Sequence, residues 1–191
     1  MKVPLRFQVT EFDCGTVSLL NAFSYLFDRE ELPALLVKKI NEYTLDCYDE
    51  DGNLGNGGTS KNAINGLTSW ITKYANENDF GVSCNRLTKE NVNLENIKLC
   101  LNNMGVVLIR CYQTEEHYAI ITKIKNKKVY IFDPYYFDKS YYDKDKDVKI
   151  VLNKPFTHNR IVSQKRIFSE NQKDFSLGII KNRECVLINR R

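Results

Sequence analysis

The stretch QVTEFDCGTVSLLNAFSYLF, residues 8–27, decides the fold of this chain. From Cys14 onward its apolar side chains recur at helical spacing, which predicts a helix over residues 14–27 with a wide apolar face. Asp13 stands at the expected N-cap. Cys14 therefore starts a core helix, where unpaired amide groups and the helix dipole stabilise a nucleophilic thiolate. The alternative is that Cys14 packs as a small apolar residue.

Helical spacing also dominates the rest of the first half of the chain. A second helix is expected with Pro33 in its first turn, another after Thr59 or Ser60, and a shorter one over residues 94–104. The intervening segment DCYDEDGNLGNGG, residues 46–58, is rich in Gly, Asp and Asn. This composition predicts an exposed loop.

The second half of the chain changes to short runs of β-branched and aromatic residues. VVLIRCY (106–112), YAIITKI (118–124) and VYIFD (129–133) predict strands, and the latter two are expected to pair antiparallel; residues 148–152 and 185–189 predict further strands. Helices followed by strands predict an α+β fold, with an N-terminal helical part packed against a C-terminal antiparallel sheet. A cleft between the two parts is a natural active site.

Candidate partners of Cys14 follow from this arrangement. His117 opens a strand, so its ring is expected at the rim of the sheet, where a general base can reach Cys14; His158 competes for this role. Asp133 ends the next strand and can meet His117 across the hairpin, which supplies the third member of a catalytic triad. Gln8 precedes the cysteine by a segment long enough to bring its amide beside the sulfur, as a donor to an oxyanion.

Four segments together resemble the bacterial peptidases that process double-glycine leader peptides: QVTEFDCGTVSLLNAF, NGGTSKNAINGL, HYAIITKI and VYIFDP. The resemblance covers residues 5–137 and implies a papain-like cysteine peptidase. In that family a cysteine, a histidine and an aspartate form the triad and a glutamine supports the oxyanion, roles that fall on Cys14, His117, Asp133 and Gln8.

The same resemblance implies a peptide or protein substrate, cut after small residues such as Gly-Gly, and no cofactor. The best-known relatives are fused to a peptide-exporting transporter. This sequence contains no Gly-x-x-x-x-Gly-Lys phosphate loop, and its apolar runs are far below the roughly 18 residues of a membrane span. A stand-alone peptidase is therefore expected, with association with a transporter or a leader peptide left open.

Length and composition favour one domain over residues 1–191, with residues 138–191 as a C-terminal extension outside the resemblance. Six cysteines without a Cys-x-x-Cys pair, and only two histidines, make a metal site unexpected. The N-terminal residues lack the apolar core of a secretory signal. Free thiols and a cytoplasmic location are expected.

The net charge of +4 is spread along a sequence in which basic and acidic residues alternate, so nucleic acid is not an expected partner. Basic residues become denser at Lys181, Arg183, Arg190 and Arg191, which indicates either a solvated tail or an anionic partner. The aromatic residues of segment 135–142 either line a peptide groove or pack within a loop.

Three classes of function remain open at this point. The first is amide hydrolysis through an acyl-enzyme. The second keeps the triad but transfers the acyl group to another acceptor, as in transglutaminases and acyltransferases, or deamidates glutamine. The third is a peptide-binding module that keeps the fold without cutting. An activated thiol would separate the third class from the first two.

Overall fold

The computed structural model describes all 191 residues. Its α-helices are α1 (Cys14–Leu26), α2 (Ala34–Tyr43), α3 (Lys61–Glu77), α4 (Leu94–Asn102) and α5 (Gln164–Ile167). Three short 3₁₀ helices are η1 (Arg29–Glu31), η2 (Lys89–Asn91) and η3 (Ile180–Asn182). The strands are β1 (Val82–Thr88), β2 (Gly105–Gln113), β3 (Glu115–Lys125), β4 (Lys128–Phe132), β5 (Val148–Ile150), β6 (Arg160–Ser163) and β7 (Glu184–Arg190).

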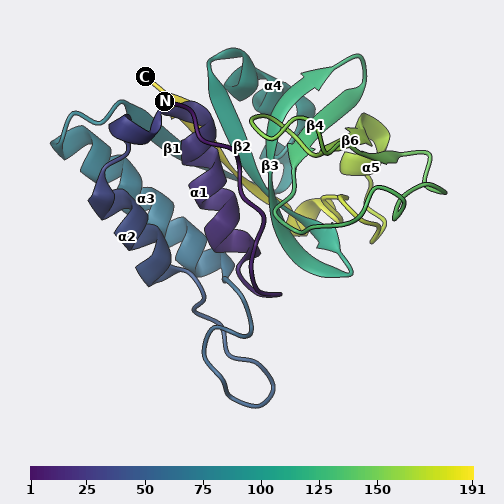
Figure 1. The fold of residues 1–191 in the computed structure, drawn as a ribbon, viewed down its shortest axis with the longest axis horizontal. Helices are drawn as coiled ribbons and strands as arrows, with labels where there is room; N and C mark the ends of the chain where they lie inside the picture. Colours follow the sequence, from purple (N-terminus) through teal and green to yellow (C-terminus); the bar gives the residue numbers. More distant parts are fainter.

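The strands form one seven-stranded sheet in the order β1-β7-β2-β3-β4-β6-β5, and every neighbouring pair is antiparallel. Figure 1 shows α1, α2 and α3 grouped on one side of the sheet and α4 on the other. The predicted α+β class is confirmed, with its N-terminal helical part packed against an antiparallel sheet. The expected pairing of the strands around residues 118–124 and 129–133 is confirmed as well.

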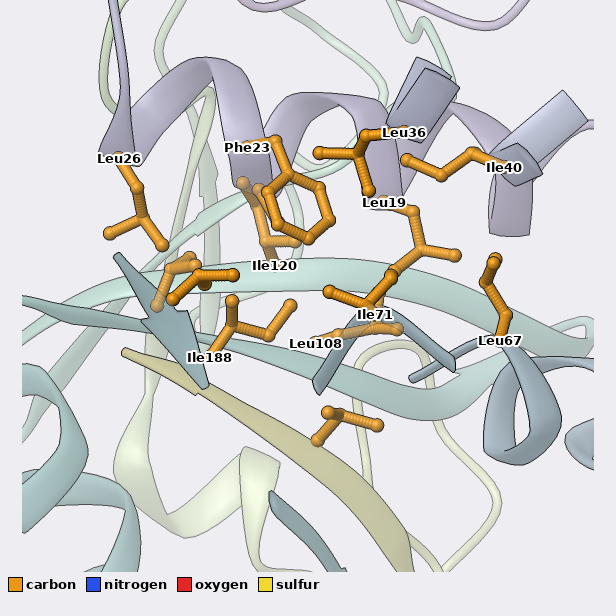
Figure 2. Packing of buried hydrophobic residues seen from close by; sticks show 14 of the residues in the cluster. Leu19, Phe23, Leu26, Leu36, Ile40, Leu67, Ile71, Leu108, Ile120 and Ile188 are labelled. Atoms are coloured by element: carbon orange, nitrogen blue, oxygen red, sulfur yellow. The ribbon is translucent and has the colours of Figure 1, made fainter. Parts of the chain in front are cut away.

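The helical layer is fixed to the sheet by an apolar core in which α1 is the central element. Leu19 of α1, Leu36 of α2 and Ile71 of α3 are fully buried, and they pack in one cluster with Leu108 of β2 and Ile120 of β3 (Figure 2). This burial follows from the helical spacing of apolar residues in the sequence. Because α1 packs directly on the sheet, the position of its first residue relative to β3 is set by the core.

A second core covers the opposite face of the sheet. Ile97 of α4 and Ile167 of α5 are completely buried there against residues of the central strands, including Val107 and Ile121. The sheet is thus covered on both faces, which explains why β2 reads as an almost continuous apolar run. No helix in the structure joins enough length with enough apolar character to cross a membrane.

Residues 138–191 take part in this sheet. They supply β5, β6 and β7, and β7 lies between β1 and β2. Strands β1 and β6 were not predicted, because β1 alternates only weakly and β6 has four residues. Both strands are held by pairing with partners distant in sequence, which local patterns do not report.

Two helix starts differ in detail from expectation. Pro33 occupies the N-cap of α2 rather than its first turn, and the single turn η1 precedes it. Ser60, one of the two expected caps, caps α3 by accepting a hydrogen bond from the amide of Ala63 at 3.0 Å. The segment 46–58 is a loop, as predicted, and in Figure 1 it projects beyond the helical layer on the side where α1 begins.

The neighbours Leu35 and Leu36 on α2 provide a matched test of the core. Leu36 is fully buried, whereas Leu35 is 43% exposed. We expect Leu36→Ala to lower the free energy of unfolding by about 2–5 kcal/mol, because it leaves a cavity in the core. Leu35→Ala should change it by less than about 0.5 kcal/mol. Urea unfolding followed by circular dichroism measures both, and equal losses would contradict the packing described here.

Candidate active site

Cys14 is the first residue of α1, and no side chain caps this helix. Asp13 occupies the N-cap position, but its carboxylate accepts no hydrogen bond from the amides of the first turn of α1. It accepts hydrogen bonds from the amide of Val9 at 3.2 Å and from the amide of Thr10 at 3.0 Å. Asp13 therefore closes the preceding loop and leaves the first amides of α1 without a side-chain acceptor, which preserves a positive field beside the Cys14 sulfur.

Gly15 serves the packing of the loop that precedes α3. A Cβ atom at residue 15 would approach the Cβ of Thr59 to 2.7 Å, closer than side chains tolerate. The Thr59 hydroxyl in turn accepts a hydrogen bond from the amide of Leu45 at 3.1 Å. Glycine at this position thus lets both ends of the loop between α2 and α3 sit against the start of α1.

His117 and Asp133 meet as the pairing of β3 with β4 predicts. His117 lies near the start of β3, and Asp133 directly follows β4. The Nε2 atom of His117 is 2.8 Å from Oδ1 of Asp133. Both side chains are buried, and Asp133 has no exposed surface. The arrangement fixes the orientation of the imidazole ring and leaves Nδ1 as the nitrogen available to the nucleophile.

The charge state of His117 is set by its two neighbours. Burial lowers the pKa of His117, but hydrogen bonds to Asp133 and to the Cys14 side chain outweigh burial and raise the pKa to about 10. The structure therefore brings Cys14, His117 and Asp133 together, with an imidazole that carries a proton at neutral pH. An imidazolium next to the sulfur stabilises a thiolate.

Asp133 is the most heavily bonded carboxylate of this region. Besides His117, its oxygens accept hydrogen bonds from the amide of Tyr135 at 2.9 Å and from Nε2 of Gln113 at 3.2 Å. Nη2 of Arg160 lies 3.1 Å from Oδ2, and this arginine has no exposed surface. Burial by itself raises the pKa of Asp133, but the bond to His117 and the charges of His117 and Arg160 hold the pKa below its usual value.

The main chain of Asp133 is clamped as well. Its amide donates to Oδ1 of Asn159 at 2.8 Å, and Nδ2 of Asn159 donates back to its carbonyl at 2.6 Å. Sequence reasoning missed Gln113, Asn159 and Arg160. The sequence feature that could have indicated them is the Asn-Arg pair directly before the short apolar run IVS. Polar residues at the start of a buried strand usually have a buried polar partner.

The competing histidine lies in a different setting. His158 precedes β6, where its Nδ1 is 2.9 Å from the Thr157 hydroxyl and its ring meets the ring of Tyr130 edge-on. Burial and the charges of nearby lysines lower its pKa. It makes no hydrogen bond to Asp133, so His117 is the histidine that the structure places beside the candidate triad residues.

Gln8 is tied to this region through its backbone, because its amide donates to the carbonyl of Pro134 at 2.8 Å. Its side-chain Nε2 donates to the carbonyl of Thr10 at 2.7 Å, and its Oε1 is buried without a partner. The amide that was expected to support an oxyanion is thus engaged within its own loop in this structure. The oxyanion role of Gln8 stays a prediction.

The remaining thiols are chemically quiet. All six cysteines are free. Burial raises the pKa of Cys84 and of Cys185 to about 12 and that of Cys100 to about 11, and it raises the pKa of Cys111 and Cys47 too. These five thiols stay protonated at neutral pH. Cys84, Cys100 and Cys111 pack as apolar residues, as expected, whereas Cys47 lies half-exposed beside Asp46 at the rim of the Cys14 cavity.

Cys14 opens into a cavity of about 460 Å³. One wall is formed by residues 56–62, at the end of the projecting loop and the start of α3, and the other by Arg110 and Tyr118 of the paired strands β2 and β3. The aromatic segment 135–142 does not line this cavity. Its rings pack on one another, with the centroids of Phe137 and Tyr141 3.9 Å apart, so the peptide-groove interpretation of this segment has no support here.

No protein-family model matches the sequence, and no curated protein matches it. Among solved structures, the chain is similar to the crystal structure of a double glycine motif protease from an AMS/PCAT transporter in complex with the leader peptide. The two sequences are 14% identical, the match covers 100% of this chain and 93% of that chain, and the TM-score is 0.48.

Proposed function

We propose that this protein is a papain-like cysteine peptidase that cuts peptide bonds through an acyl-enzyme on Cys14. The observation that carries the proposal is the placement of the three side chains. Cys14 starts an uncapped helix, and His117, whose pKa is raised to about 10 by Asp133 and Cys14, is held at 2.8 Å by the buried Asp133. This combination activates a thiol and supplies both a proton donor and an orienting carboxylate.

The chemistry follows from the charge states. The Cys14 thiolate attacks the scissile carbonyl carbon, and the negative charge that develops on the carbonyl oxygen is stabilised by the free amides at the start of α1. His117 then gives its proton to the leaving amine, and an acyl thioester remains on Cys14. Water, deprotonated by the now neutral His117, attacks the thioester. The acid product leaves, and the thiolate and the imidazolium are restored.

Gln8 can complete the oxyanion site after a small rearrangement. The hydrogen bond from its side-chain Nε2 to the carbonyl of Thr10 lies within the loop that Asp13 closes. This hydrogen bond can be exchanged for one to a bound substrate. The unpartnered Oε1 indicates that the side chain is not fully satisfied in this structure.

The engaged amide of Gln8 also favours one alternative, a peptide-binding module without turnover. In that case the Cys14 cavity would hold an extended segment, and the thiol would contribute only packing. Alkylation of the thiol distinguishes the two functions, because only an activated sulfur reacts rapidly.

We expect iodoacetamide to label Cys14 alone near neutral pH, and to label it at pH 6 almost as fast. His117 stays protonated across this range because its pKa is about 10, so the positive charge beside the sulfur is kept. His117→Ala should slow labelling at pH 6 by about tenfold or more, since an ordinary thiol has a pKa of about 8.5. Peptide mapping by mass spectrometry, with Cys14→Ala as the control, identifies the site. Slow labelling of the wild type would support the binding module.

We expect Gln8→Ala to reduce kcat by about a hundredfold while leaving the melting temperature within a few degrees of the wild type, because one oxyanion donor is lost. Thr10→Ala is the matched control: it leaves the backbone carbonyl that Gln8 contacts and should leave kcat nearly unchanged. Unchanged turnover in Gln8→Ala would restrict this residue to a structural role in its loop.

Small residues before the cut are expected from the family that the sequence resembles. A peptide with Gly-Gly before the scissile bond should be cleaved about tenfold faster or more than versions with Leu at either glycine, because a side chain beside the reacting carbonyl must fit next to α1. A Leu placed several residues upstream is the control and should be tolerated. If bulky residues at the cut are cleaved equally fast, the narrow specificity is absent from this chain.

A further inference from the structure

A second hollow adjoins the Cys14 cavity. It has a volume of about 360 Å³, and its ten lining residues are all polar or charged. Lys61, Arg110 and Glu116 line both the hollow and the Cys14 cavity, so the two spaces share a wall. A chain bound next to Cys14 therefore passes directly beside this hollow.

The hollow holds the excess positive charge of the protein. Six of its lining residues are Lys or Arg and two are Glu, a surplus of four cations that equals the formal net charge of +4 of the whole chain. The remaining residues of the chain are balanced. Lys181 and Arg183, for which the sequence left both a solvated tail and an anionic partner open, line this hollow.

The three arginines are already engaged. Arg110 pairs with Glu116, and its Nη1 lies 3.4 Å from Glu184. Arg86 lies 2.7 Å from the other oxygen of Glu184. The guanidinium of Arg183 donates to two backbone carbonyls. The two glutamates compensate the charges of Arg86 and Arg110, whereas Arg183 is held by carbonyl groups only.

The three lysines are not compensated. Lys61, Lys89 and Lys181 are exposed, and none forms an ion pair with a carboxylate of this chain. Lys89 and Lys181 lie on η2 and η3, which are joined by a hydrogen bond of 2.9 Å from the amide of Lys89 to the carbonyl of Arg183. Lys61 approaches from α3. Ammonium groups from three separate elements thus surround one hollow.

Two of these lysines are placed against local preference. Lys61 is the first residue of α3, where the positive end of the helix dipole disfavours a cation, and no acidic residue lies in that first turn. Lys89 has a φ of 54°, in the left-handed region that non-glycine residues rarely adopt. Residues that oppose local preference are typical of functional positions.

A buried hydroxyl group beside the Cys14 cavity has no hydrogen-bond partner. Tyr118 is only 4% exposed and lines the Cys14 cavity, yet its hydroxyl has no hydrogen-bond partner. Buried polar groups in folded proteins are normally paired. The Tyr118 hydroxyl is thus an unsatisfied polar group behind the wall of the Cys14 cavity, and it does not line the basic hollow.

We propose that this basic hollow binds the carboxylate of a Glu or Asp side chain of the peptide that lies in the Cys14 cavity. The proposal rests on the proposed peptidase function and adds an acidic residue to its substrate class. Nucleic acid fits less well, because the hollow has no exposed aromatic side chain on which a base could stack. An acidic side chain of the bound peptide fits the charge of the hollow, and the wall shared with the Cys14 cavity puts the hollow next to the peptide.

The test measures binding on the Cys14→Ala protein, which leaves the peptide uncut. Fluorescein-labelled Gly-Gly peptides carry one Glu, moved one position at a time, and are compared with Gln counterparts by fluorescence polarisation. At one position, Glu should bind about threefold to tenfold more tightly than Gln. This preference should vanish between about 50 mM and about 500 mM salt, because exposed ammonium groups are screened.

The double variant Lys61→Gln with Lys181→Gln should abolish the preference for Glu. Both side chains are exposed, so folding should be unaffected. The matched control, Lys98→Gln with Lys149→Gln, removes the same charge from exposed positions outside the hollow and should keep the preference.

Two outcomes would overturn the inference: equal binding of Glu and Gln peptides at every position, or a single-stranded oligonucleotide that displaces the peptide at lower concentration. A failure of the proposed function looks different. The wild type would then cut none of these peptides, while the Cys14→Ala protein would still prefer Glu and lose that preference in the Lys61 and Lys181 variant.

Discussion

The carboxylate of Asp133 is charged and wholly buried, and the residues around it supply its hydrogen bonds and counter-charges. An isolated carboxylate in a protein interior costs far more free energy than a folded chain can spare. Here the charge is matched by His117 on one oxygen and by Arg160 on the other. Removal of Asp133 would leave two buried cations without a counter-charge, so the geometry of the candidate triad and the stability of the fold depend on the same group.

This constraint explains the role of the C-terminal segment. Arg160 reaches Asp133 only because β6 pairs with β4, and the same strand brings Asn159 to clamp the main chain of Asp133. The segment beyond residue 137 therefore holds Asp133 of the candidate triad in position through Asn159 and Arg160. A chain that ended at the limit of the family resemblance would lack both the counter-charge and the clamp.

The sequence allowed prediction of what depends on local pattern. The helix that starts at Cys14 and the hairpin that joins His117 to Asp133 follow from spacing and from strand adjacency. Arg160 and Asn159 could not be predicted, because their role requires the pairing of β6 with a strand almost thirty residues earlier. The basic hollow was missed for the same reason: Lys61, Lys89 and Lys181 are far apart in sequence and meet only through the fold.

The electrostatic field around Cys14 unites these features. A protonated His117 and the uncapped end of α1 act at short range, whereas the lysines at the start of α3 and on η2 and η3 act from the next hollow. Each favours negative charge, first on the sulfur and then on the oxygen of a substrate. Four of the other thiols, those of Cys84, Cys100, Cys111 and Cys185, lie in apolar surroundings, where burial raises their pKa. The positive charge that the fold places around Cys14 is the feature on which its proposed reactivity depends.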